Sequence, residues 1–165
     1  MPDVHRIGVI YDTHLPHRAA RIPDAALRYF EDVELILHAG DLSTRAALDQ
    51  LEAYAPVEAV QGNVEDAEIV RTLPIKRQIT VGGCLIGMVH ILGDRATRRE
   101  AARREFPDAR VIIFGHSHIP FAEDRDGLLL LNPGSATDRR RRPHCAIALL
   151  TITDGSPTAE IISLP

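Results

Sequence analysis

Short apolar runs that end in Asp or His are the feature of this sequence that most restricts its fold. The segments RIGVIYDTH, ELILHAGD, LIGMVH and VIIFGHSH each pass directly from aliphatic residues to potential metal ligands. Apolar runs of about four to eight residues are typical of buried strands. Open α/β sheets bind their ligands at the carboxyl ends of such strands. The pattern therefore predicts a sheet with a polar site along one edge.

Seven candidate metal ligands follow one another along the chain: Asp12, His14, Asp41, Asn63, His90, His116 and His118. Some have an ordinary explanation when taken alone. Asp41 could cap the next helix, Asn63 could hold a tight turn, and His90 could be a hydrogen-bonded core histidine. The conjunction of all seven favours a metal site.

The spacing of these residues adds a geometric argument. In an extended segment, residues i and i+2 point the same way, so Asp12 and His14 can share one ion. By the same argument, His116 and His118 present two imidazoles to a common cavity. Oxygen and imidazole ligands without thiolate suit Mn²⁺, Fe²⁺, Zn²⁺ or Ni²⁺ better than Ca²⁺.

The first half of the chain reads as a βαβαβ unit. The expected elements are a strand at 6–10, a helix at about 23–30, a strand at 34–39, a helix capped by Ser43 or Thr44, and a strand at 56–60. This order predicts a parallel sheet.

The second half is mostly β. Two strands at 76–81 and 84–89 flank Gly82-Gly83, which is a hairpin signal. A basic helix is expected at about 96–106, with Arg98, Arg99, Arg103 and Arg104 on its solvent side. Further strands are expected at 110–114, 119–123, 128–131, 145–151 and 158–163. A parallel first half and an antiparallel second half predict an α/β sandwich.

The composition is that of an ordinary folded protein, with 45% hydrophobic and 25% charged residues and a net charge of -4. A chain of 165 residues suits one domain, over 1–165. No run approaches the roughly 20 apolar residues of a membrane span. The N-terminus lacks a signal-peptide pattern, so a cytoplasmic location is expected. Cys84 and Cys145 have no Cys-x-x-Cys partner and are expected to stay reduced.

The motif series D-x-H, G-D, G-N, H and G-H-x-H resembles the calcineurin-like metallophosphoesterases, from Ile7 to about Thr151. The turn Asn132-Pro133-Gly134-Ser135 resembles the small single-domain phosphodiesterase branch of that superfamily. The resemblance implies a four-layer αββα sandwich of two mixed β-sheets flanked by helices. It also implies two metal ions with Asp41 between them. The first ion would take Asp12, His14 and His118, and the second would take Asn63, His90 and His116.

The activity that this resemblance implies is dinuclear-metal-dependent phosphodiester hydrolysis of small phosphoesters. Two ions about 3.5 to 4 Å apart acidify a bridging water, and the resulting hydroxide attacks phosphorus. Asp41, Asn63 and His116 are the expected catalytic residues. Mn²⁺ is the first expectation for the metal, with Ni²⁺, Fe²⁺ and Zn²⁺ as alternatives.

Other functions stay open. A phosphomonoesterase or nucleotidase is one alternative. Another is a non-catalytic protein-interaction scaffold of the same fold, since a retromer subunit of similar fold has turned its metal face to protein binding. Nucleic acid is disfavoured as a partner because the basic stretches lack interleaved aromatic residues. A homo-oligomer is left open.

Several positions depart from the superfamily pattern or lie outside it. Val64 stands where many members have a proton-donating His, so phenolate leaving groups should depart more readily than alkoxides. Tyr11 and Ile91 replace the usual small residues. His17 and Arg139 are the only candidates for substrate binding, and a solvated charge run is the simpler interpretation of Arg139.

Overall fold

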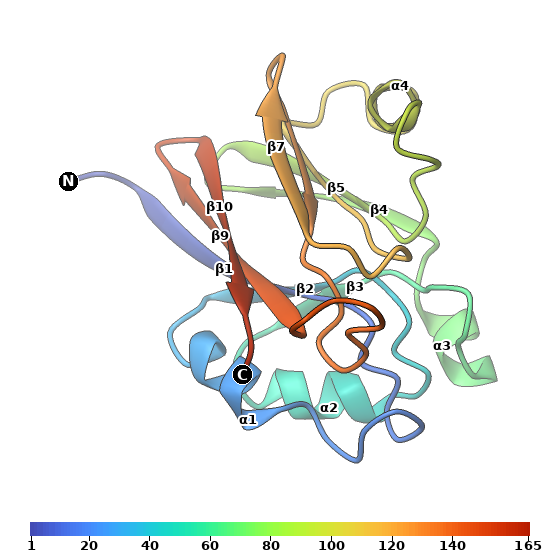
Figure 1. Ribbon diagram of the computed structural model, residues 1–165. Helices are drawn as coiled ribbons and strands as arrows, with labels where there is room; N and C mark the ends of the chain where they lie inside the picture. Colours follow the sequence, from blue (N-terminus) through green and yellow to red (C-terminus); the bar gives the residue numbers. More distant parts are fainter.

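The computed structural model describes residues 1–165 and consists of two five-stranded sheets packed face to face (Figure 1). The first sheet has the strand order β10 (Ser156–Ser163), β9 (Ala146–Thr153), β1 (Val4–Ile10), β2 (Leu35–His38) and β3 (Val57–Ala59). The strands β1, β2 and β3 run parallel, as predicted. β9 runs antiparallel to both β1 and β10. The sheet is therefore mixed and contains both ends of the chain.

The second sheet has the strand order β4 (Lys76–Val81), β5 (Cys84–Val89), β6 (Val111–Ile113), β8 (Leu128–Asn132) and β7 (Phe121–Arg125). The predicted hairpin is confirmed, because Val81 pairs with Cys84 across a turn. Gly82 and Gly83 there have φ of 54° and 79°, as a two-residue type I′ turn requires.

The direction of β6 corrects one prediction. β6 runs parallel to both β5 and β8, so the second half is not purely antiparallel. Between β5 and β6 the chain passes through α4 (Arg98–Glu105). A crossover of this kind joins strands that run in the same direction, whereas the sequence pattern predicts an antiparallel second half.

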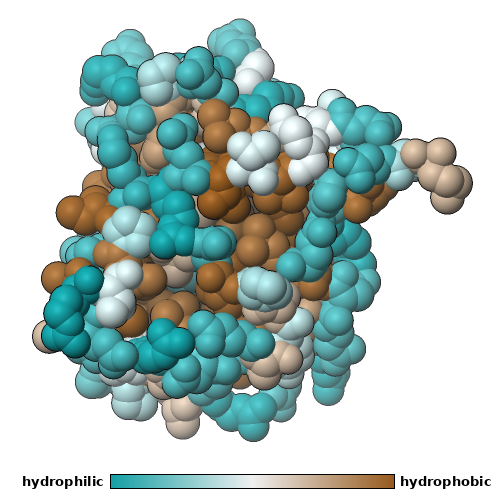
Figure 2. Space-filling model, turned by 180° about the vertical axis from the view of Figure 1, so that it is seen from behind, coloured by the Kyte–Doolittle hydropathy of each residue, from teal (hydrophilic) through white to brown (hydrophobic).

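The main core lies between the two sheets. Ile7, Val9 and Tyr11 point into it from β1 and the residue that follows, while Met88 and Ile113 approach from the other sheet. Alternate residues of a strand face opposite sides, so Ile10 packs instead on the outer face of the first sheet. The edge strand β4 has no strand beyond it, and its Ile79 and Val81 stay half-buried. On the back of the molecule, hydrophobic residues gather in the middle of the surface between hydrophilic borders (Figure 2).

Helices complete the four layers, and the predicted αββα sandwich is confirmed. The helices α1 (Asp24–Leu27), η1 (Arg28–Phe30) and α2 (Ala46–Glu52) cover the first sheet, and α4 covers the second. The helix expected at 23–30 is thus a short α-helix that continues as a 3₁₀ turn. None of the helices combines the length and the apolar composition of a membrane span.

Of the two residues predicted to cap α2, Thr44 is the one whose hydroxyl accepts a hydrogen bond from the backbone N–H of Ala46 (3.3 Å), the first residue of the helix. Arg45, which directly precedes α2, makes no side-chain cap. Ser43 does not take part, because its hydroxyl lies 3.1 Å from Nδ1 of His14. The helix α3 (Ala67–Thr72) was not predicted, although Asp66 caps it by accepting a hydrogen bond from the N–H of Ile69 (2.9 Å). An Asp directly before a helix is a sequence signal for its start, so α3 could have been predicted from Asp66.

Three of the four α4 arginines are less exposed than predicted, whereas Arg104 is exposed as predicted. The guanidinium of Arg98 lies 4.7 Å from the ring centroid of Phe114, and Arg99 donates to Glu123 and to the Leu128 carbonyl. Arg103 donates to the carbonyl of Ala109. An Ala- and Arg-rich helix has few large apolar residues, so arginine stems and cation–π contacts attach it to the sheet.

Candidate metal centre

All seven candidate ligands lie in loops that follow the carboxyl ends of parallel strands. Asp12 and His14 follow β1, Asp41 follows β2, and Asn63 follows β3. In the second sheet, His90 follows β5 and the pair His116 and His118 follows β6. The two sheets therefore bring chemistry-bearing loops from distant parts of the sequence to one end of the sandwich.

The backbone of these loops is not extended, which corrects the geometric argument from i, i+2 spacing. Asp12 and His14 have φ of 59° and 46°, and Asp41 has φ of 59°. His116 and His118 have φ of 71° and 61°. Asp and His tolerate this left-handed region better than most residues. Such conformations persist where the surroundings over-determine them, as is common at functional sites.

Asp12 lies at the centre of the first group of side chains and is fully buried. Its Oδ2 accepts a hydrogen bond from Ser135 and lies 3.2 Å from Nε2 of His118. Its Oδ1 contacts Nε2 of His14 and has no hydrogen-bond partner. A buried carboxylate oxygen without a partner is costly unless a cation is near it.

Asp41 connects the first group to the second. Its Oδ1 accepts from the N–H of Asn63 (3.0 Å). Its Oδ2 lies 3.2 Å from Nε2 of His90 and 3.9 Å from Nε2 of His14. Burial alone would raise the pKa of this carboxyl, but the nearby imidazole of His90 and the hydrogen bond from the N–H of Asn63 outweigh it and hold the pKa below its ordinary value. Asp41 is therefore an anion shared by both groups.

Asn63, His90 and His116 form the second group. Oδ1 of Asn63 lies 3.0 Å from Nε2 of His90, and the His90 and His116 rings have centroids 5.4 Å apart. His116 is exposed, whereas His118 is buried beside Asp12. The two histidines of Gly-His-Ser-His thus serve different groups. Desolvation, followed by the nearby His90, lowers the pKa of His116, which favours the neutral imidazole that metals bind.

Backbone carbonyls fix the tautomers of two histidines. Nδ1 of His90 lies 2.9 Å from the Ala39 carbonyl, and Nδ1 of His118 lies 2.9 Å from the Asp138 carbonyl. A carbonyl only accepts hydrogen bonds, so Nδ1 donates, and in the neutral ring Nε2 keeps a lone pair. Each lone pair then faces a carboxylate oxygen at 3.2 Å. Metal-binding histidines show this arrangement, so the residues present fit divalent cations.

Two residues that sequence reasoning missed support this centre. Asp138 offers a carboxylate that lies with Asp12 and His118 within 4.8 Å, although it also pairs with Arg18 at 3.0 Å. Glu65 accepts hydrogen bonds from the N–H groups of Ser43 (2.8 Å) and Gly62 (2.9 Å). No motif covers these positions, and their roles depend on loops that meet only in the folded chain.

His38 lies behind the centre and is completely buried. The N–H of Gly40 donates to its Nδ1 (3.1 Å), so its Nε2 donates to the hydroxyl of Thr13 (3.0 Å). Burial lowers the pKa of His38 to about 3. His38 therefore joins the two loops that carry Asp12 and Asp41 without contacting either carboxylate.

The positions that depart from the superfamily pattern differ in burial. Val64 and Ile91 are exposed beside Asn63 and His90. Tyr11 is fully buried, with its ring centroid 5.4 Å from those of both His90 and His118. Its hydroxyl has no hydrogen-bond partner. Tyr11 is thus part of the packing beneath the histidines.

The two candidates for substrate binding are both exposed. His17 makes no side-chain hydrogen bond and does not line the pocket beside His118 or the pocket beside Asn63 and His90. Arg139 lines a pocket next to His118, but its guanidinium donates to the carbonyl of Arg142 (2.8 Å).

Comparison with known proteins agrees with this geometry. The sequence profile of the calcineurin-like phosphoesterase superfamily domain matches residues 6–155. A probable metallophosphoesterase of Methanothermobacter thermautotrophicus is 41% identical over 160 residues, which cover 94% of this chain and 91% of that protein.

Solved structures agree as well. Vps29 of Entamoeba histolytica in complex with Zn²⁺ has a TM-score of 0.74 and 27% identity, covering 96% of this chain and 98% of that chain. Vacuolar protein sorting 29 of Cryptosporidium parvum shares the fold with a TM-score of 0.80 at 19% identity, covering 98% of each chain.

Proposed function

The chain belongs to the calcineurin-like phosphoesterase superfamily, and on that premise we propose that it is a phosphodiesterase that hydrolyses small phosphoesters with two bound divalent ions. The observation that carries the proposal is the pair of buried carboxylates, Asp12 and Asp41, each faced by an imidazole nitrogen at 3.2 Å. Asp41 also lies between the two groups of histidines. Such an arrangement is stable only if positive charge is supplied between these groups.

The proposed ligand sets follow the two groups of side chains. Asp12, His14 and His118 would hold one ion, Asn63, His90 and His116 would hold the other, and Asp41 would serve both. Mn²⁺ is the first candidate, with Ni²⁺, Fe²⁺ and Zn²⁺ as alternatives. When bound, such ions neutralise charge on a phosphoryl group and lower the pKa of water.

The chain's own residues set the positions of the ligands and the supply of protons. Ser135 and Glu65 hold the loops of Asp12, Asp41 and Asn63 in place. Val64, beside Asn63, has no proton to donate, which favours esters whose leaving group departs as a stable anion. We therefore propose diesters with acidic leaving groups over alkyl monoesters. We also propose that residues 1–165 act as one domain in the cytoplasm.

The test is a panel of phosphomonoesters, diesters and nucleotides, assayed with protein loaded with Mn²⁺, Ni²⁺ or Zn²⁺. Elemental analysis of the loaded protein should give about two equivalents of metal per chain. The variant Asp41→Asn should lose turnover and most of the bound metal while it keeps its fold, because it removes the charge shared by both groups. Wild-type turnover by Asp41→Asn, or binding that stays at one equivalent, would contradict the two-metal proposal.

A protein-interaction scaffold is the second candidate, and the match to vacuolar protein sorting 29 over 98% of the chain favours keeping it. The variant His116→Ala discriminates between the enzyme and the scaffold, because His116 belongs to the candidate metal centre. A scaffold that uses other surfaces would bind its partner equally well with and without His116. Turnover of no phosphoester, together with a partner captured equally by both proteins from the source cell, would replace the enzyme proposal.

A further inference from the structure

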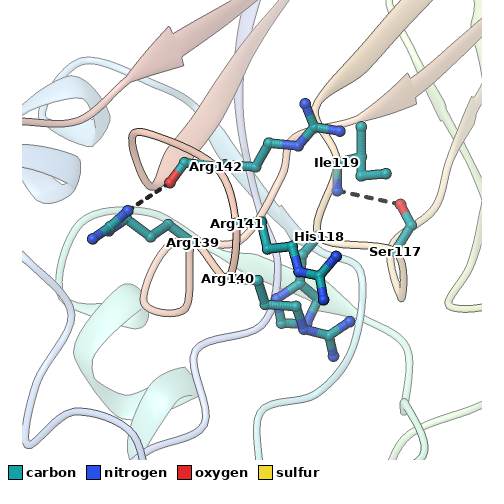
Figure 3. Close-up of a pocket in the computed structure, with 7 residues that line it drawn as sticks. All are labelled: Ser117, His118, Ile119, Arg139, Arg140, Arg141 and Arg142. Carbon is teal, nitrogen blue, oxygen red and sulfur yellow. Dashed lines mark hydrogen bonds between the residues drawn. The ribbon is translucent and has the colours of Figure 1, made fainter.

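A pocket adjoins the candidate metal centre and shares His118 with it. The pocket has a volume of about 660 Å³ and is lined by Ser117, His118 and Ile119 and by the loop residues Arg139–Arg142 (Figure 3). On its other side, His118 lies 3.2 Å from the carboxylate of Asp12. A molecule whose phosphoryl group sits at the centre can therefore extend past His118 into this pocket.

Three guanidinium groups in the pocket have no partner. Figure 3 shows Arg140, Arg141 and Arg142 reaching toward the side of the pocket formed by His118, Ser117 and Ile119, whereas Arg139 turns the other way. None of the three makes an ion pair or donates a side-chain hydrogen bond. By contrast, Arg110 pairs with Asp124 at 2.9 Å.

Asp138, which lies just before the arginines in the sequence, does not form an ion pair with any of the three. Asp138 pairs with Arg18 at 3.0 Å and accepts from the backbone N–H of Arg140 at 3.2 Å. Like charges held close together repel one another. An anion placed among them removes that repulsion.

Phosphate is the anion that suits this pocket best. The planar guanidinium fork matches two oxygens of a phosphate group with two parallel hydrogen bonds. The exposed side chain of Ile119 offers an apolar wall for the organic part of a ligand. A free inorganic anion would make no apolar contact with Ile119.

We propose that Arg140, Arg141 and Arg142 bind a second phosphate of the substrate, so that the preferred substrates are small organic phosphoesters that carry another phosphate group. This inference rests on the proposed phosphoesterase function and names its substrate class. The three arginines determine specificity and take no part in bond cleavage.

The kinetic test uses two substrates that differ by one phosphate. They are thymidine 5′-(4-nitrophenyl phosphate) and the same ester with a 3′-phosphate. Wild type should show a KM at least about tenfold lower for the 3′-phosphorylated ester, with a similar kcat, since charge-assisted hydrogen bonds to phosphate exceed that effect. The triple variant Arg140→Gln/Arg141→Gln/Arg142→Gln should lose this preference and cleave the plain ester as wild type does. Equal KM values in wild type would overturn the proposal.

The matched control removes three charges elsewhere. Arg28, Arg71 and Arg104 are exposed and unpaired, so Arg28→Gln/Arg71→Gln/Arg104→Gln has the same net charge as the pocket variant. The preference for the 3′-phosphate should survive in this control. If both triple variants lose it equally, net charge and not the pocket is responsible, and the proposal fails.

A binding measurement separates this inference from the proposed function. Calorimetry of the metal-free protein with thymidine 3′,5′-bisphosphate should show binding that weakens at least about tenfold in the pocket variant only, and that weakens with added salt. If no ester is cleaved but this binding holds, the phosphoesterase proposal fails and the subsite stands. Tighter, pocket-dependent binding of a single-stranded oligonucleotide would identify nucleic acid as the ligand and overturn the small-substrate proposal.

Discussion

The hydroxyl of Ser135 donates a hydrogen bond to Oδ2 of Asp12, and this contact joins two loops 123 residues apart in the sequence. The same hydroxyl accepts a hydrogen bond from the N–H of Asp138 (2.8 Å). Ser135 therefore fixes the direction of a buried carboxylate and also ties down the loop that precedes the arginines of the pocket.

The first prediction concerns this hydrogen bond. Ser135→Ala should lower metal affinity by about 10- to 100-fold, because it removes a hydrogen bond that orients a ligand. Stability should fall by only about 1 to 3 kcal/mol, the cost of an unpaired buried acceptor. The measurement is competition against a chelator of known affinity, alongside thermal unfolding. The control Ser156→Ala changes an exposed serine of β10 and should leave metal affinity unchanged.

Sequence predicts most of this fold because its signals are local. The Gly82-Gly83 hairpin and the strand ends at Asp12, Asp41 and His90 each follow from a short run of residues. Motifs also predict which side chains meet at the centre. The parallel direction of β6 could not be read in the same way, since it depends on how the chain crosses the sheet through α4.

The misses at the centre share a physical cause. Asp138 and Glu65 act through loops that become neighbours only after folding. The left-handed backbone at Asp12 and His14 is imposed by tertiary contacts, such as the hydrogen bond from the Asp12 N–H to the Gly40 carbonyl (3.1 Å). A rule for extended segments could not anticipate it. The partial burial of Arg98 likewise depends on Phe114 and Phe121, which come from other elements.

The second prediction concerns Gly62, which lies against Asp41. A Cβ at position 62 would collide with Oδ1 of Asp41 and approach its backbone N to 2.5 Å. Gly62→Ala should therefore displace this carboxylate and abolish binding of at least one metal ion. Metal stoichiometry is the measurement. Gly127→Ala is a control for the steric collision, because a Cβ at position 127 meets nothing within 4 Å. Its backbone strain is larger than at Gly62, since Gly127 has a φ of 75°. If Gly62→Ala still binds two ions, the loop can move without loss of metal binding and the prediction is wrong.

The third prediction concerns the pH dependence of stability. An unfolded His titrates near 6.5, and burial lowers the pKa of His38 in the folded protein to about 3. Between these values the unfolded chain binds a proton that the folded chain does not. The contribution of neutral, buried His38 to the free energy of unfolding is complete above pH 6.5. It is lost as the pH falls toward 3, and the free energy of unfolding then decreases by at most about 1.4 kcal/mol per pH unit.

Denaturant unfolding of the metal-free protein across this range checks the prediction. His38→Gln should flatten the slope of unfolding free energy against pH, whatever its effect on stability at neutral pH. His144→Gln, an exposed position, should keep the wild-type slope. Identical slopes in wild type and His38→Gln would assign the proton uptake to other groups.

The last prediction concerns Val64, which is 45% exposed beside Asn63. Val64 cannot protonate a leaving group, so the rate should depend steeply on the pKa of the leaving group, and aryl diesters should be cleaved far faster than alkyl monoesters. Val64→His places a titratable donor at the same position and should flatten that dependence. The gain should be largest for poor leaving groups, where general acid catalysis typically contributes about 10²- to 10⁴-fold.

The measurement is a series of substituted phenyl phosphoesters with wild type, Val64→His and Val64→Ala. The last variant tests whether loss of the valine side chain alone has an effect. A flat profile in wild type would show that another group supplies the proton, and His17→Ala would then test the one exposed histidine in the Asp12 loop.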